Sequence, residues 1–402
     1  MKKRFLFHSI LDHLDEKEIT LIQGSRQTGK TTLLEQVQRE LISRKKPTTF
    51  LSLEDKKPLV ELNEYPPNLF RFSPPMTSGK RHYFFIDEIQ YLDNPANFLK
   101  HLYDIYKDKI KLIVSSSSGF YIDKKFKDSL AGRKQIFELQ TMGFKEFLFF
   151  RGYEEMSEYV HTDYVPKIYI NDLKILLDEY LLYGGYPKVV LSETLKQKQN
   201  VLKEIGVAYV KKDIDESSII YPEAYRDILS ILSKQVGNLF NLNTAGKSLK
   251  IKSETVQSYL YIMVKSFHIA LVKPFYKSAV TELRKMKKAY FQDLGLRNFF
   301  AGNFNPILLR DDRGELLENY VYRLFADHYD TDWDIKYWRT QKKQEVDFII
   351  QEKQAFEVKF SDKLFKPYKY KFFKNKYPDI PFKLLTYNNV LEFSPGGEKL
   401  YE

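Results

Sequence analysis

The stretch from Glu18 to Leu34 is EITLIQGSRQTGKTTLL, in which a short apolar run is followed by a glycine-containing loop and a helix-forming segment. The loop matches the whole pattern G-x-x-x-x-G-K-[ST], and its flanks supply the strand and helix that the pattern requires. Its two glycines let the backbone curl so that N–H groups and the N-terminus of the next helix point at phosphate oxygens. We therefore predict a nucleotide-binding loop made of Gly24, Ser25, Arg26, Gln27, Thr28, Gly29, Lys30, Thr31 and Thr32.

A glycine-rich turn that binds no nucleotide is the alternative, and a second motif argues against it. His82 to Gln90 is HYFFIDEIQ, an apolar run that ends in two adjacent carboxylates and indicates a Walker B strand. Burial of this run in a parallel sheet places Asp87 at the carboxyl edge, where such sheets bind ligands. A solvated acidic turn is the plainer explanation of the pair, but the complete loop upstream favours a nucleotide site.

The two motifs together assign roles in ATP hydrolysis. We expect Lys30 to reach the β and γ phosphates of ATP. Thr31 and Asp87 are the expected Mg²⁺ ligands, the latter through water. Glu88 is expected to polarise the attacking water and, with Lys30, to be catalytic.

Composition limits the classes of protein to consider. The chain has 402 residues, enough for two or three domains, and its 43% hydrophobic and 29% charged residues are typical of a folded globular protein. Sixty-four Lys and Arg against 53 Asp and Glu give a net charge of +11, which favours a polyanionic partner such as DNA. With no cysteine, disulfides and Cys-ligated zinc are excluded. We see neither a signal peptide nor an apolar run of about 18 residues, so we expect a cytoplasmic protein with no membrane partner.

The segments around the motifs alternate between expected helices and strands. We expect helices over 5–14, over 30–43 and over 97–106, and further strands over 48–53 and 111–114, with a proline-rich surface loop over 63–80. This alternation predicts a parallel α/β sheet. The last strand runs into Ser115 to Ser118, which is either a sensor of the γ-phosphate or a flexible loop or helix cap.

These motifs, followed by the sequence SLAGRKQIFELQTMGFKEFL, resemble bacterial and archaeal AAA-type P-loop ATPases that carry a large C-terminal domain of uncharacterised role. The resemblance continues in the family's order through YLLYGGYPKVV (180–190), KKDI (211–214), KAYFQDLGL (288–296), ELLENYV (315–321) and residues 337–360. It implies that Ser117 is the sensor, although Ser116 stands where the family has glycine. It also implies that Arg133 contacts the γ-phosphate, in cis or from a neighbouring subunit of a homo-oligomer; a surface arginine in a loop is the alternative.

The middle of the chain gives a different signal. Between residues 226 and 276 the pattern is helix, turn, helix and then a hairpin-like run. Five apolar residues lie on one face of a helix that Ser253 caps: Val256, Tyr259, Leu260, Met263 and Val264. Residues 242–249 are the expected preceding helix, and residues 269–275 with 288–291 the expected wing strands. Nearby lysines would contact DNA phosphates: Lys247, Lys250, Lys252 and Lys265. A winged helix-turn-helix is thus one explanation, and a helical connector or a protein-docking module is the other.

The last hundred residues hold a second group of polar side chains. KQEVDFII (343–350) and AFEVKF (355–360) indicate two paired strands, and their alternation puts Asp347, Glu357 and Lys359 on one surface, with Glu345 on the face of Asp347. The D-x9-E-x-K spacing resembles the restriction-endonuclease-like PD-(D/E)XK fold, with Glu318 in the place of its helical acid. That resemblance implies catalytic Asp347, Glu357 and Lys359, a metal held by Glu318, Asp347 and Glu357, and nucleic acid near Trp338 and Arg339. A solvated hairpin, or a nuclease fold without activity, is the alternative.

The expected fold is α/β, with three domains: a P-loop AAA-type domain over 1–155, a helical and winged-helix region over 156–295, and a nuclease-like α/β domain over 296–402. The expected function is Mg²⁺-dependent ATP hydrolysis that controls a DNA-binding, nuclease-like C-terminal domain. The alternative is a nucleotide-switched regulator that binds DNA or another protein and uses the nuclease-like fold as a scaffold.

Overall fold

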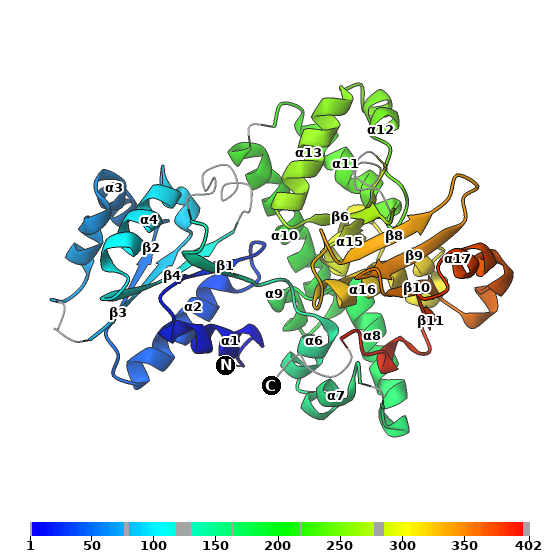
Figure 1. The fold of residues 1–402 in the computed structure, drawn as a ribbon, viewed down its shortest axis with the longest axis horizontal. Helices are drawn as coiled ribbons and strands as arrows, with labels where there is room; N and C mark the ends of the chain where they lie inside the picture. The colour runs from blue at the N-terminus through cyan, green and yellow to red at the C-terminus, as the bar shows by residue number, and fades with distance from the viewer. Residues whose placement is uncertain are drawn as a thin grey trace. The chain divides into compact units, whose positions relative to one another are not determined.

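The computed structural model describes residues 2–75, 80–117, 130–162, 164–217, 219–276 and 285–396. The chain divides into two compact units (Figure 1). The N-terminal unit contains residues 1–140 together with 265–267, and the C-terminal unit contains residues 141–264 and 268–402. Among the described helices, none is long and apolar enough to cross a membrane.

The N-terminal unit is built on a five-stranded sheet in the order β2-β3-β4-β1-β5. Its strands are β1 (Ile19–Gln23), β2 (Thr48–Ser52), β3 (His82–Asp87), β4 (Ile110–Ser116) and β5 (Lys134–Glu138). All four pairings are parallel, which confirms the expected parallel sheet. Every residue of β3 and β4 is buried, because central strands of such a sheet are covered on both faces.

Helices cover both faces of this sheet, and adjacent strand residues divide between two cores. Ile22 and Phe85 share one core with apolar residues of α1 (Leu6–Asp12) and α2 (Lys30–Ser43). Leu21 and Ile86 share the other with α3 (Lys56–Glu64) and α4 (Pro95–Tyr106). The alternation of side chains along a strand therefore fixes which helix each residue contacts.

The expected proline-rich loop is partly helical. Helix α3 continues to Glu64, and a 3-10 helix follows from Pro66 to Phe72 with Leu69 fully buried. Proline suits the first positions of a helix because its missing N–H has no partner there. Residues 76–79 of the expected loop lie outside the described part of the chain.

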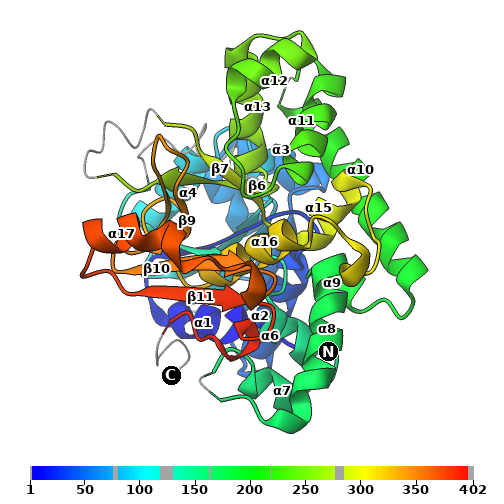
Figure 2. The same ribbon diagram turned by 90° about the vertical axis from the view of Figure 1, so that its right-hand side faces the viewer.

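The C-terminal unit combines helices with a second sheet (Figure 2). Its helices are α6 (Phe144–Phe150), α7 (Glu154–Tyr159), α8 (Ile170–Tyr183), α9 (Pro187–Val190), α10 (Leu195–Glu216), α11 (Pro222–Lys234), α12 (Leu242–Leu249), α13 (Ser253–Lys265), α15 (Leu294–Ala301), α16 (Arg313–Ala326) and α17 (Lys371–Lys376). The longest of these, α10, begins with a capping box in which Thr194 and Gln197 bond each other's backbone N–H groups.

The second sheet has six strands in the order β11-β10-β9-β8-β6-β7. They are β6 (Ile269–Pro274), β7 (Lys288–Phe291), β8 (Ile335–Arg339), β9 (Glu345–Ile350), β10 (Gln354–Lys359) and β11 (Phe382–Thr386). The expected hairpins β6–β7 and β9–β10 are both antiparallel. Strand β6 also pairs in parallel with β8, so strands from both sides of residue 295 share one sheet. The compact units therefore differ from the three ranges expected from sequence.

Candidate functional site

The loop between β1 and α2 needs both of its motif glycines. Gly29 has φ +93°, a left-handed conformation that side-chain-bearing residues rarely adopt. Gly24 has a different constraint, since a Cβ there would lie 2.1 Å from the backbone oxygen of Leu139. The first glycine thus permits close packing of the chain, and the second permits the turn into α2.

Lys30 lies inside the curl of this loop. Its side chain is buried, and Nζ donates hydrogen bonds to the backbone oxygens of Gly24 at 3.0 Å and Ser25 at 2.9 Å. Thr28 Oγ1 donates to the same Ser25 oxygen at 2.8 Å. A cation is therefore held by backbone oxygens of the loop where α2 begins, and a helix N-terminus is a favourable place for phosphate oxygens.

The phosphate-binding loop meets the Walker B strand through Thr31. Thr31 Oγ1 donates a hydrogen bond to Asp87 Oδ2 at 2.6 Å, joining the start of α2 to the end of β3. The other carboxylate oxygen, Oδ1, accepts a hydrogen bond from Ser115 Oγ on β4. A hydroxyl and a carboxylate are the oxygen ligands that Mg²⁺ takes when phosphate oxygens and water complete its coordination. These two side chains fit the expected Mg²⁺ position.

Glu88 follows Asp87 in a left-handed conformation, with φ 57°. Such a φ is uncommon outside glycine and often marks a functional position. The backbone N–H of Glu88 donates to Ser115 Oγ at 2.9 Å. Gln90 Nε2 donates both to Glu88 Oε2 and to Ser117 Oγ, the latter at 3.0 Å. Ser117 is thus connected to Glu88 through Gln90, while Ser115 contacts Asp87 directly.

The sequence did not assign the roles of two contributors to this site, Ser115 and Arg4. Ser115 belongs to the serine run, but the sequence did not distinguish it from its neighbours; Ser118 of that run lies outside the described residues. Arg4 donates to the backbone oxygen of Thr28 at 2.7 Å and to that of Gln140 at 2.9 Å, so it supports the loop from the N-terminal segment. No local pattern around Arg4 indicates this long-range contact. Of the remaining loop residues, Arg26 is half-buried, and Gln27, Thr31 and Thr32 are exposed.

Arg133 lies at the other edge of the sheet. Its backbone oxygen accepts a hydrogen bond from the N–H of Ile19 at 2.8 Å, at the beginning of β1, whereas the nucleotide loop follows the end of β1. Its side chain pairs with Asp104 of α4, with Nε 2.7 Å from Oδ1. Arg133 therefore does not reach the loop of its own chain, and the expectation of a contact in cis is wrong; a contact in trans stays a prediction.

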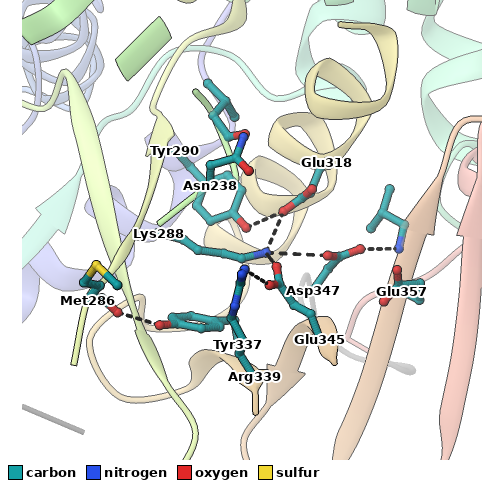
Figure 3. Close-up of polar contacts among 12 residues, drawn as sticks. Asn238, Met286, Lys288, Tyr290, Glu318, Tyr337, Arg339, Glu345, Asp347 and Glu357 are labelled. Carbon is teal, nitrogen blue, oxygen red and sulfur yellow. Dashed lines mark hydrogen bonds and ion pairs between the residues drawn. The ribbon is translucent and has the colours of Figure 1, made fainter. Parts of the chain in front are cut away.

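A second polar cluster surrounds Lys288 of β7 in the C-terminal unit (Figure 3). Its Nζ, buried at 1% exposure, lies 2.6 Å from Glu345 Oε1, 3.2 Å from Glu318 Oε1 and 3.5 Å from Asp347 Oδ1. Glu318 also accepts a hydrogen bond from Tyr290 at 2.7 Å. We call Lys288 and its three carboxylates the Lys288 cluster. Burial alone would lower the pKa of Lys288, but Glu318, Asp347 and Glu345 outweigh it and raise the pKa.

The structure also brings together Asp347, Glu357 and Lys359, as strand alternation predicts. Lys359 Nζ lies 3.6 Å from Asp347 Oδ2 and forms an ion pair with Glu357 Oε1. Glu357 Oε1 also accepts a hydrogen bond from Tyr370 at 2.7 Å, whereas its buried Oε2 has no hydrogen-bond partner in the described structure. Burial and the charge of Asp347 raise the pKa of Glu357, and the same two causes raise the pKa of Glu318. Raised pKa values favour a shared proton in this cluster.

The expected metal ligands Glu318, Asp347 and Glu357 do not fit a metal ion. Glu318 and Asp347 converge on the ammonium of Lys288, which supplies the positive charge that a divalent cation would bring. Glu357 instead faces Lys359 and Tyr370. Among the described residues, no three Asp, Glu or His side chains are arranged to hold a metal. This arrangement disfavours the expected metal site, which stays a prediction: β7 places a lysine among the acids, which the D-x9-E-x-K pattern does not include.

The expected stacking of Trp338 on nucleic acid is wrong, whereas the expected phosphate contact of Arg339 stays a prediction. Trp338 is 4% exposed and packs against Phe373 and Tyr377, with ring centroids 5.1 Å and 6.3 Å away. Arg339 forms an ion pair with Glu345. Because the indole is part of the core, it cannot stack on a base.

The expected helix pair of the middle region is present as α12 and α13. Asn241 caps α12 by accepting a hydrogen bond from the N–H of Thr244 at 3.0 Å, and α13 begins at Ser253. The predicted apolar face of α13 is confirmed at four buried positions: Val256, Tyr259, Leu260 and Met263. Lys247, Lys250 and Lys252 are exposed and Lys265 is half-buried, and their DNA-contacting role stays a prediction.

Three family models match successive parts of the chain. Residues 16–148 match a family described as an AAA domain. Residues 174–306 and 313–395 match two families described as domains of unknown function, DUF8612 and DUF4143. These matches support an AAA-type ATPase with C-terminal regions of unknown function.

Similar proteins exist in archaea and bacteria. An uncharacterised protein of Methanocaldococcus jannaschii is 25% identical, over 96% of this chain and 86% of its own length. An uncharacterised protein of Haemophilus influenzae is 23% identical over 73% of this chain and 72% of its own. The Thermotoga maritima RuvB Holliday junction branch migration motor superimposes with a TM-score of 0.29 and 19% identity, over 66% of this chain and 88% of RuvB. A replication initiator DnaA bound to AMPPCP and single-stranded DNA superimposes with a TM-score of 0.34 and 16% identity, over 64% of this chain and 85% of DnaA.

Proposed function

We propose that this chain is an Mg²⁺-dependent ATPase. The observation that carries the proposal is the hydrogen bond from Thr31 to Asp87, because it brings the hydroxyl of the phosphate-binding loop and the carboxylate of the Walker B strand to one place. The match to an AAA family over residues 16–148 supports the same conclusion. ATP is the nucleotide expected at such a loop.

The residues of the N-terminal unit divide the work of hydrolysis. Lys30 stabilises negative charge on the β and γ phosphates, and Thr31 with Asp87 holds Mg²⁺. Mg²⁺ held by these residues would neutralise charge that develops on the phosphate oxygens. Glu88 orients the attacking water, and Gln90 connects it to Ser117, which senses the γ-phosphate. Arg133 acts only across a subunit boundary, so this role requires a homo-oligomer.

Removal of the Lys30 amine tests the nucleotide site. We expect Lys30→Ala to lower ATP turnover by about 100-fold or more, because the charge that stabilises the transferring phosphoryl group is lost. The matched control is Lys46→Ala, which removes an exposed lysine shortly after α2. Phosphate release measured on both variants and the wild type checks the prediction; equal turnover in Lys30→Ala and Lys46→Ala would contradict the assignment.

For the C-terminal unit, we propose a DNA-binding scaffold with a nuclease-like fold that does not cut DNA. The Lys288 cluster favours this alternative over a nuclease, because its three acids already share the charge of one lysine, whose Nζ lies within 3.5 Å of each. The ATP state of the N-terminal unit then controls binding and not cleavage, since a γ-phosphate orders or releases the loops that contact it.

Incubation with DNA distinguishes a DNA-binding scaffold from a nuclease. We expect supercoiled, linear and single-stranded DNA to stay intact with the wild type in Mg²⁺ or Mn²⁺, with and without ATP. Gel electrophoresis of the products is the measurement, and Asp347→Ala is the control for contaminating nuclease. Cleavage by the wild type that Asp347→Ala abolishes would overturn the scaffold and restore the nuclease.

A further inference from the structure

Residues 363–376, with the sequence KLFKPYKYKFFKNK, form a strongly basic segment of the C-terminal unit. The segment contains six lysines and no acidic residue, whereas the net charge of the whole chain is +11. It follows β10 and consists of the end of a 3-10 turn, a second 3-10 turn at Pro367–Tyr370 and helix α17. We call it the basic segment (Figure 2).

Aromatic side chains fix the inner side of the basic segment to the sheet. Tyr370 and Phe373 are buried, and their ring centroids lie 5.0 Å and 6.3 Å from that of Phe382 on β11. Phe365 stacks on Tyr370 at 5.1 Å, and the Tyr370 hydroxyl bonds Glu357. The backbone of the basic segment is therefore held in place before any partner binds, which lowers the entropic cost of binding.

The lysines of the basic segment reach solvent, and two of their ammonium groups, those of Lys374 and Lys376, also lie over the rings of Phe382 at 4.8 Å and Tyr377 at 5.4 Å. All six lysines are exposed: Lys363, Lys366, Lys369, Lys371, Lys374 and Lys376. Within the described structure, no carboxylate forms an ion pair with any of them, whereas surface lysines elsewhere do, as Lys17 does with Asp108 and Lys188 with Glu204. Clustered like charges repel one another, and a chain of phosphates relieves that repulsion and releases counterions.

Exposed rings lie among these lysines. Tyr368 is 63% exposed and Phe372 is 50% exposed, and Phe372 stacks on buried Trp338 with centroids 6.1 Å apart. Exposed rings beside lysines form platforms on which unpaired bases stack. Bases in a duplex are already stacked on each other, so these rings favour a single strand. A membrane surface is a poorer partner, because the six residues of α17 are too few for an interfacial helix.

We propose that the basic segment binds single-stranded nucleic acid, with phosphates on its lysines and bases on Tyr368 and Phe372. The proposal rests on the proposed DNA binding of the C-terminal unit. It adds which surface of that unit binds and that this surface prefers a single strand to a duplex. It places the main contact on the basic segment and not on the lysines of α12 and α13.

A pair of matched triple variants of the full chain tests this placement. Lys366→Gln/Lys369→Gln/Lys371→Gln removes three charges from the basic segment, and Lys247→Gln/Lys250→Gln/Lys252→Gln removes three from the helix pair. Fluorescence anisotropy with a labelled oligo-dT of about 20 nucleotides, longer than the site of one binding module, is the readout. We expect the first variant to bind at least about tenfold more weakly. The slope of the logarithm of affinity against the logarithm of salt concentration should become shallower by about 2, because each lost phosphate contact contributes about 0.7. The second variant should bind like the wild type.

A second variant tests the rings. Tyr368→Ala should weaken binding of the single strand by about fivefold or more, because stacking on one ring is worth about 1–3 kcal/mol, and should leave binding of a duplex of equal length unchanged. Equal weakening by both triple variants, or weakening by the helix-pair variant alone, would overturn the proposal. Binding to anionic phosphatidylserine vesicles without binding to oligo-dT would overturn it in favour of a membrane surface.

ATP turnover measured on the same samples separates this proposal from the ATPase. Turnover without any binding of oligo-dT by the wild type would contradict the basic segment's role and leave the ATPase intact. If oligo-dT binds through the basic segment but ATP is not turned over, the result would contradict the ATPase and support the proposed binding surface.

Discussion

Lys288 determines the chemistry of the C-terminal cluster. Its ammonium lies between Glu318, Glu345 and Asp347, so the charge of these acids is partly compensated within the protein. A buried lysine without such partners would lose its proton, whereas here the carboxylates hold the proton on Nζ. Carboxylates outnumber cations in this region. The cations are Lys288, Lys359 and Arg339, and the carboxylates are Glu318, Glu345, Asp347 and Glu357. One carboxyl group is therefore favoured in its protonated form.

The raised pKa of Glu318 predicts how stability changes with pH. Burial, followed by the charge of Asp347, raises this pKa from its usual 4.5 to about 7, so between these values the folded protein keeps a proton that the unfolded chain has released. The free energy of unfolding should therefore fall as pH rises from 4.5 to about 7, by at most about 1.4 kcal/mol for each pH unit. Glu318→Gln should make this fall shallower. Urea unfolding between pH 5 and pH 8 is the measurement.

An exposed glutamate of the same unit provides the control for this experiment. Glu193→Gln should leave the slope of stability against pH as it is in the wild type, because Glu193 lies on the surface before α10. A slope that is identical in Glu318→Gln and Glu193→Gln would show that Glu318 is already ionised in the folded protein, contrary to its position beside Asp347.

At the scale of elements, the sequence predicted what depends on local pattern. The order β1, loop, α2 and the apolar strand ending at Asp87 followed from spacing and composition, as did the β9–β10 hairpin that aligns Asp347 with Glu357. Periodicity does not reveal which distant strands pair. The parallel contact of β6 with β8 joins Lys273 to Lys336, and it is this sheet that includes β7 and Lys288. The position of Lys288 among these acids was therefore not predictable from the D-x9-E-x-K motif.

The same limit explains the residues whose surroundings differ from expectation. Trp338 lies two residues from Lys336 in a strand, and its burial depends on Phe373 and Tyr377, which come from α17 and the residue that follows it. Arg133 lies in a stretch whose sequence resembles AAA-type ATPases, but only the pairing of β5 with the beginning of β1 shows that it lies away from the loop. In both cases the deciding contact is distant in sequence.

At the scale of the whole molecule, the two units carry different chemistry. The N-terminal unit joins Lys30, Thr31, Asp87 and Glu88 into a candidate ATP site, and the C-terminal unit contains the basic segment and an acidic cluster that its own cations partly neutralise. The net charge of +11 is thus partly localised on one short segment, positions 363–376. We propose a nucleic-acid-binding ATPase in which hydrolysis and binding are separately measurable.

ATP turnover by Glu88→Gln tests the central claim most directly, since this change keeps the size of the side chain and removes its ability to polarise water. The control is Glu64→Gln, at the exposed end of α3. We expect Glu88→Gln to bind a fluorescent ATP analogue as tightly as the wild type while its turnover falls by about 100-fold or more. Turnover equal to that of Glu64→Gln would contradict an ATPase site built on Asp87 and Glu88.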